Sequence, residues 1–298
     1  MPDKCKIDFT MATTRSRRAI LTERINALVG ADKPLRELAG NLSKVAKYAI
    51  DEANSLSLER VEIKLPRLPK RLDGLKVIHL SDIHHSPFTG LDHINRAIKV
   101  ANRLKPDMFV LTGDFVSHEA EYIRPVAEAL GTLNAEFGVH ACLGNHDHWT
   151  DPYLVADELR NAGINVFINE GKRIDVRGVS IWLAGVDDHM VGKTDLPLAL
   201  KGSFPDEFKL LLAHNPIIFR KAVRAGVDLT FSGHTHGGQV KVRTKPEQDR
   251  LLPRRKLTAG LHQRKESAIY ITRGIGTVVL PIRYQCPPEI SLLELRTA

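Results

Sequence analysis

Cysteine is scarce in this chain, and long apolar runs are absent from it. Its 298 residues include three cysteines, Cys5, Cys142 and Cys286, which are far apart in the sequence. This excludes a disulfide framework and a cysteine zinc site, and it fits a reducing compartment. The longest uncharged run, 229–240, is shorter than the roughly 20 apolar residues that a spanning helix needs. We therefore expect a cytoplasmic protein whose contact with a membrane, where it exists, is peripheral.

The excess of positive charge is confined to two segments. The formal net charge is +8 at pH 7. Residues 1–60 carry a net +3 and residues 241–256 a net +5, so the rest of the chain is neutral. A nucleic-acid groove needs a broad basic surface, which argues against nucleic acid as a partner. We expect instead one local loop that faces an anionic group.

Residues 1–70 lack the alternation of strands and helices that follows them, and we interpret them as an N-terminal appendage with a linker. Within them, apolar residues recur at the spacing of an amphipathic helix, at Leu38, Leu42, Val45, Ala46, Ala49 and Ile50. Such a helix packs on the following domain or lies on a membrane surface, and the sequence leaves both open. No apolar stretch follows the Ser16-Arg17-Arg18 string, which argues against an export signal.

Short apolar runs alternate with helical periodicity from residue 71 to residue 298, which we predict to be one domain. Strands are predicted at 75–80, 108–111, 139–143, 165–167, 174–176, 181–184, 209–213, 228–231, 268–272 and 290–295, and helices over 92–104, 120–133, 153–162 and 217–225. This order is typical of an α/β fold with a largely parallel sheet. The functional residues of such folds lie at the carboxyl ends of strands.

Five polar strings follow predicted strands. They are Ser81-Asp82-Ile83-His84, Gly113-Asp114, Gly144-Asn145-His146-Asp147, Ala213-His214-Asn215 and Gly233-His234-Thr235-His236. Each string alone is common in a turn or a helix cap. Asp82, Asp114 and Asn145, however, are about 30 residues apart, the length of one βαβ unit, so neighbouring strands bring them to one sheet edge. Residues two apart in an extended segment project to the same side, which lets His234 and His236 face one point.

The chemistry of these side chains predicts a metal centre. Carboxylate, imidazole and amide ligands without sulfur suit Mn²⁺, Fe²⁺ or Zn²⁺, and we favour Mn²⁺. Four histidines, two aspartates and one asparagine are too many for one tetrahedral site. Two divalent ions that share Asp114 are the simplest arrangement.

The ordered set of strings resembles the calcineurin-like metallophosphoesterase superfamily over residues 75–298. The resemblance implies a four-layer α/β/β/α sandwich, in which two sheets lie between helices. It also implies a first metal ion held by Asp82, His84, Asp114 and His236, and a second held by Asp114, Asn145, His214 and His234. His146 is then the histidine beside the phosphate that binds no metal.

Two such ions lower the pKa of a bridging water, so that hydroxide attacks the phosphorus in line. His146 is positioned to protonate the leaving group as a general acid. Asp147 either holds that imidazole and raises its pKa or caps the following helix. His85 and His148 adjoin ligands, and we expect them beside the metal site rather than on a metal.

Further strings are similar to those of bacterial membrane-associated phosphodiesterases, a branch that includes UDP-diacylglucosamine pyrophosphatases. They are Gly233–Val240, Arg273–Thr277 and Cys286–Ile290. The resemblance implies hydrolysis of phosphodiester or pyrophosphate bonds in a small phosphorylated or nucleotide-lipid substrate. Those relatives commonly carry a membrane anchor or export signal where this chain has its polar appendage.

The basic segment 241–256 follows the last predicted ligand. Within it, Arg254 and Arg255 are candidates for substrate binding, because the guanidinium fork matches phosphate oxygens. A nuclease or cyclic-nucleotide phosphodiesterase built on the same site is an alternative, against which the neutral body of the domain argues. A non-catalytic partner-binding protein is another, against which the complete ligand set argues.

Overall fold

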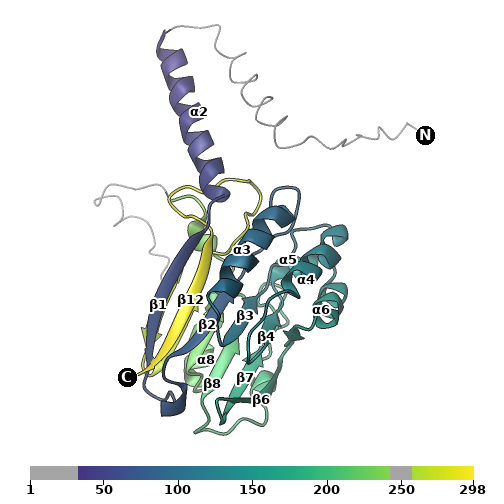
Figure 1. Cartoon of the computed structure of the whole chain (residues 1–298), viewed down its shortest axis with the longest axis vertical. Coiled ribbons are helices and arrows are strands. Elements are labelled where there is room, and N and C mark those ends of the chain that lie inside the picture. The colour runs from purple at the N-terminus through teal and green to yellow at the C-terminus, as the bar shows by residue number, and fades with distance from the viewer. Residues whose placement is uncertain (1–32, 242–256) are drawn as a thin grey trace, which may run out of the picture. The chain divides into compact units, whose positions relative to one another are not determined.

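Two six-stranded sheets form the framework of the structure, a computed structural model that describes residues 33–241 and 257–298 (Figure 1). The first sheet has the order β1-β12-β2-β3-β4-β5. Its strands are β1 Ser57–Leu65, β2 Leu75–Leu80, β3 Met108–Thr112, β4 Val139–Cys142, β5 Asn165–Val166 and β12 Glu289–Thr297. The second sheet has the order β10-β11-β9-β8-β7-β6. Its strands are β6 Glu170–Val176, β7 Val179–Gly185, β8 Lys209–Leu212, β9 Leu229–Ser232, β10 Gly260–Arg264 and β11 Ser267–Ile271.

Helices cover the outer faces of both sheets and complete four layers. The first sheet packs against α3 Leu91–Arg103, α4 Ile123–Leu130 and α6 Pro152–Asn161, and the second against α7 Leu196–Ala199 and α8 Phe219–Arg224. The helix α5 Asn145–Thr150 follows β4, and 3-10 turns occur at Lys70–Leu72, Ala120–Tyr122, Pro216–Ile218 and His236–Gly238. The predicted four-layer α/β sandwich is confirmed.

The period of two in each strand explains why the layers form. In β2, Val77 faces the core between the sheets, whereas Ile78 faces the core beneath the helices. In β8, Leu210 and Leu212 extend from the other side into the core between the sheets. Each such buried aliphatic side chain contributes about 1.5–3 kcal/mol. The two sheets are therefore held face to face by apolar burial.

One strand of the first sheet lies within the segment that we interpreted from its sequence as appendage and linker. β1 pairs in parallel with all nine residues of β12, from Ser57 opposite Glu289 to Leu65 opposite Thr297. Ile63 and Leu65 are buried in the core between the sheets. The strand was missed because Pro66 and Pro69, which follow it closely, are typical of a linker, although exposed and more buried residues alternate along it. The strand β10 was also not predicted. The strands and helices that were predicted are present, with ends shifted by a few residues.

The amphipathic helix predicted over residues 38–50 is confirmed as part of α2 Lys33–Ala53. The chain divides into two units between Ala49 and Ile50, within this helix. Among the described residues, no helix combines the length and apolarity needed to span a membrane. The two roles considered for this helix stay predictions.

Removal of β1 is expected to destabilise the domain, because it withdraws Ile63 and Leu65 from the core and exposes the edge of β12. We expect residues 71–298 to unfold at a temperature at least about 5 °C below that of residues 50–298. Thermal unfolding followed by circular dichroism, with size-exclusion chromatography for aggregation, measures the difference. Equal melting temperatures and monodisperse elution of both chains would contradict this role of β1.

Candidate metal centre

The seven candidate ligands lie at the carboxyl ends of five strands. Two follow β2, one follows β3, one follows β4, one follows β8 and two follow β9; they are Asp82, His84, Asp114, Asn145, His214, His234 and His236. Six of the seven are buried, and His234 is partly buried. Both sheets therefore contribute to a single cluster, in which Asp82, Asp114 and Asn145 share one edge of the first sheet.

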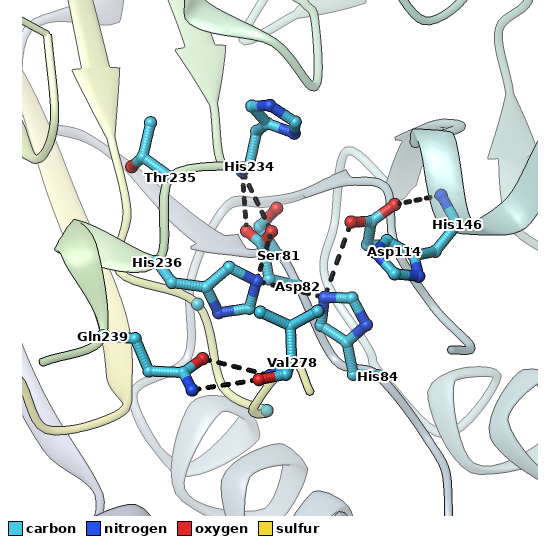
Figure 2. A network of polar contacts seen from close by, with 12 residues as sticks. Ser81, Asp82, His84, Asp114, His146, His234, Thr235, His236, Gln239 and Val278 are labelled. Atoms are coloured by element: carbon cyan, nitrogen blue, oxygen red, sulfur yellow. Dashed lines mark hydrogen bonds and ion pairs between the residues drawn. The ribbon is translucent and has the colours of Figure 1, made fainter. Parts of the chain in front are cut away.

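Three of these side chains converge on the first candidate position (Figure 2). The Nε2 atoms of His84 and His236 are 3.1 Å apart, and His236 Nε2 lies 3.3 Å from Asp82 Oδ1. Potential ligand atoms of Asp82, His84 and His236 all lie within 4.8 Å of one another. One ion between them would contact both imidazoles and the carboxylate.

Asp114 lies between this group and a second one. Its Oδ2 atom is 3.5 Å from His84 Nε2 and 3.2 Å from His214 Nε2. On the far side, His234 Nδ1 lies 3.2 Å from His214 Nε2 and 3.0 Å from Asn145 Oδ1. A single carboxylate therefore faces both groups of donor atoms, which is the position of a bridging ligand.

Burial sets the protonation of these donors. It lowers the pKa of His84 to about 3 and that of His236 well below its ordinary value, so both rings are neutral. Burial alone would raise the pKa of Asp114, but the charge and hydrogen bond of His214 outweigh it and keep the carboxylate ionised. Neutral imidazole and ionised carboxylate are the forms that bind divalent cations. Against the effect of burial, Asp114 raises the pKa of His214 to about 10, so His214 has to release a proton when it binds a cation. With no sulfur among them, the donors fit Mn²⁺, Fe²⁺ or Zn²⁺.

Five of the candidate ligands have left-handed backbone conformations. The φ angles are 50° at Asp82, 50° at His84, 56° at Asp114, 70° at His234 and 50° at His236. Such conformations cost about 1–3 kcal/mol each in residues other than glycine, and they cluster at functional sites. The backbone is thus strained where it carries the ligands.

Close approach of glycines holds the carboxylates in place. A Cβ atom on Gly233 would lie 2.0 Å from Ser81 Oγ and 2.2 Å from Asp82 Oδ2, and one on Gly144 would lie 2.2 Å from Asp114 Oδ1. The backbone N–H of His234 donates to Asp82 Oδ1 over 2.9 Å. Only glycine leaves room for these contacts.

Backbone carbonyls orient two of the histidines. Nδ1 of His214 donates to Thr112 O over 2.6 Å, which turns Nε2 toward Asp114. Nδ1 of His146 donates to Ser117 O over 2.9 Å, which fixes that ring in the same manner. The His146 ring also lies edge-on to His84, with centroids 4.7 Å apart.

Asp147 does not hold His146, which corrects one of the two roles considered for it. Its carboxylate accepts hydrogen bonds from the backbone N–H groups of Asp114, Phe115 and Gly144, over 2.8, 2.8 and 2.9 Å. Within the described residues, no hydrogen bond joins Asp147 to His146. The contact with Gly144 caps α5, which is the alternative role. Asp147 thus fixes the loop that carries Asp114.

His85 and His148 make hydrogen bonds outside the set of candidate ligands. Nδ1 of His85 is 2.9 Å from Thr89 O. Nε2 of His148 forms a hydrogen bond with the carboxylate of Asp187, which follows β7, and this contact connects α5 to the second sheet.

Arg283 belongs to the site although it was not among the residues predicted from the sequence. Its buried guanidinium donates to the carbonyls of Arg273, Gly274 and Gly276, and it lies 3.5 Å from His236 Nδ1. Nothing in the local sequence signals this contact. Arg254 and Arg255 lie outside the described residues, so their contact with substrate stays a prediction.

Fold and site together define a metal-dependent phosphoester hydrolase. The chain belongs to the calcineurin-like phosphoesterase family, whose model matches residues 75–238. It is 33% identical over 266 residues to "Uncharacterized metallophosphoesterase YkuE" of Bacillus subtilis, which covers 87% of this chain and 91% of that protein. It is 33% identical over 231 residues to "Phosphodiesterase YaeI" of Escherichia coli, and the match covers 74% of this chain and 82% of that protein. It is also 32% identical to the bovine "Transmembrane protein with metallophosphoesterase domain", covering 84% of this chain and 59% of that one.

Replacement of Gly233 by alanine is expected to weaken metal binding by at least about tenfold, because the new Cβ displaces the carboxylate of Asp82. Isothermal titration of the metal-stripped protein with Mn²⁺ measures the effect. Gly90→Ala is the matched control, since its φ is −77° and no atom lies within 4 Å of the position that its new Cβ would take. Equal Mn²⁺ affinity in the two variants would contradict the steric argument.

Replacement of His148 by alanine leaves the Asp187 carboxylate, which is 6% exposed, with the backbone N–H of Asp188 as its remaining hydrogen-bond donor. We expect a loss of about 1.5–3 kcal/mol in the free energy of unfolding, measured by urea denaturation. Arg124→Ala, which breaks an ion pair in which the arginine is 71% exposed, should cost less than about 1 kcal/mol. Similar losses of unfolding free energy in both variants would contradict a larger contribution from the buried His148–Asp187 contact than from the exposed ion pair.

Proposed function

We propose that the protein hydrolyses phosphodiester or pyrophosphate bonds with two divalent metal ions, of which Mn²⁺ is the favoured one. The observation that carries this proposal is the position of Asp114, whose Oδ2 faces His84 on one side and His214 on the other. Such a carboxylate suits two ions that lie close together. The two groups of ligands would be Asp82, His84, Asp114 and His236, and Asp114, Asn145, His214 and His234.

The chemistry that two bound ions supply is a water of lowered pKa for in-line attack and neutralisation of charge on the phosphoryl oxygens. The remaining requirement is a proton for the leaving oxygen, and we assign it to His146 as general acid. Its Nδ1 donates to Ser117 O, so Nε2 faces the substrate side and carries the proton for the leaving oxygen when the ring is an imidazolium. Its backbone N–H donates to Asp114 Oδ1 over 2.9 Å, which ties the residue to the bridging carboxylate.

The substrate that we propose is small and phosphorylated. The similarity to a bacterial protein named a phosphodiesterase supports diesters over monoesters. The neutral charge of the chain outside its two basic segments favours a small substrate over a nucleic acid. A nucleotide-lipid substrate and peripheral contact with a membrane stay predictions.

Hydrolysis of bis-p-nitrophenyl phosphate and p-nitrophenyl phosphate, by metal-stripped protein and after addition of Mn²⁺, tests the proposal. We expect metal-dependent turnover that is faster on the diester. His146→Ala should lower kcat by about 10²–10⁴-fold while Mn²⁺ binding persists, because only the proton donor is removed. Asp114→Asn should lose both Mn²⁺ binding and turnover.

His262→Ala is the matched control, since His262 lies on β10 and contacts Ala259 O; it should retain parent activity. Undiminished kcat in His146→Ala would exclude the general-acid role. Faster turnover of the monoester would contradict the diester preference. Stoichiometric Mn²⁺ binding without turnover of either substrate would favour the partner-binding alternative.

A further inference from the structure

The strand β7 ends at the same edge as two ligand-bearing strands, yet no ligand is assigned to it. β7 pairs in parallel with β8, with Gly185 opposite Leu212. β8 pairs in parallel with β9 in turn. Asp188 therefore follows β7 at the edge where His214 follows β8 and His234 follows β9. In an open α/β sheet this edge is where functional side chains gather.

The carboxylate of Asp188 is buried, and one of its two oxygens has a hydrogen-bond partner among the described residues. The residue is 1% exposed. Its Oδ1 atom accepts a hydrogen bond from the backbone N–H of Met190 over 2.7 Å. Its Oδ2 atom has no hydrogen-bond partner among the described residues. A buried carboxylate oxygen without a partner is costly, which indicates that a cation or hydrogen-bond donor binds there in the functional protein.

The carboxylate lies within electrostatic reach of the second group of ligands. Burial lowers the pKa of His234, and the charge of Asp188 is among those that oppose this shift. Burial likewise acts to lower the pKa of His214, but Asp114 most strongly, and Asp188 with it, raise it. Burial and then the charge of Asp188 raise the pKa of Cys142, the last residue of β4. Asp188 thus follows β7 next to the end of β8, near enough to His214 and His234 for its charge to act on both.

The structure of its loop does not require this charge. The adjacent Asp187 already fixes the loop: it pairs with His148, and its backbone groups contact Asn169 and Thr194. The Oδ1 contact of Asp188 with Met190 could be made equally by an asparagine. A carboxylate is needed here only if its second oxygen serves something else.

We propose that Asp188 is an additional residue of the metal centre, and that its Oδ2 binds the divalent ion held by His214, His234 and Asn145, directly or through a water molecule on that ion. The inference rests on the proposed two-metal function and deepens it. It gives the second site a negative charge that the bridging Asp114 otherwise supplies alone. Asp188 would thereby raise the affinity of this site for the cation.

Titration of the metal-stripped full chain with Mn²⁺ tests this proposal without reference to turnover. In Asp188→Asn, one of the two Mn²⁺ sites should weaken by about 10–100-fold while the other changes less than twofold. Asp188→Ala, which removes the amide oxygen as well, should weaken the same site at least as much. Asp195→Asn is the matched control in the same loop, because its carboxylate only caps α7 by accepting from Leu198 N.

Thermal unfolding of the metal-free variants separates binding from structure. A metal-free melting temperature close to that of the parent, with a smaller rise on addition of Mn²⁺, supports the proposal. Mn²⁺ affinities within twofold of the parent would overturn it, and so would a loss of metal-free stability without a change in affinity. A parent chain that binds only one Mn²⁺ ion would overturn the two-metal function, and this inference with it.

Discussion

The position of the Asp114 carboxylate is the constraint on which the rest of the site depends. Its Oδ2 atom faces His84 and His214, so one side chain joins the donors of both sheets. The residue is held in a left-handed conformation by Asp147, which accepts from its backbone N–H, and it packs against Gly144, where a Cβ atom would not fit. The contacts that neighbouring polar strings make with Asp114 thus fix the position of its carboxylate.

This arrangement costs stability, which the surrounding apolar cores offset. Strained backbone, closely spaced imidazole nitrogens and the free oxygen of Asp188 are all unfavourable in the protein alone. The cores beneath and between the sheets contain fully buried side chains such as Phe109 and Phe231. Sites of this kind exchange stability for function, because groups arranged to bind a cation repel or desolvate one another without it.

Much of the site could be predicted because its signals are local. A strand followed by a short polar string is visible in sequence, and a regular spacing places such strings at one edge. The strand β1 was missed although Glu62 and Lys64 alternate with buried Ile63 and Leu65, because its partner β12 lies at the other end of the chain. The contacts of Asp147 could not be assigned in advance, since they depend on how β3 and β4 meet. Asp188 carries the same local signal as the ligands, because it follows a strand and lies between Gly185 and His189, but it was not among the residues predicted from the sequence.

The division of the candidate ligands between the sheets would link metal binding to folding. The first sheet supplies Asp82, His84, Asp114 and Asn145, and the second supplies His214, His234 and His236. The apolar core between the sheets therefore sets the distance between the ligands from the first sheet and those from the second. A bound ion in turn connects the sheets at their carboxyl edge, and a ligand that binds only the folded state stabilises that state. Core packing and cation binding thus depend on the same separation of the two sheets, so a substitution in the core between them can alter the metal centre without touching a ligand.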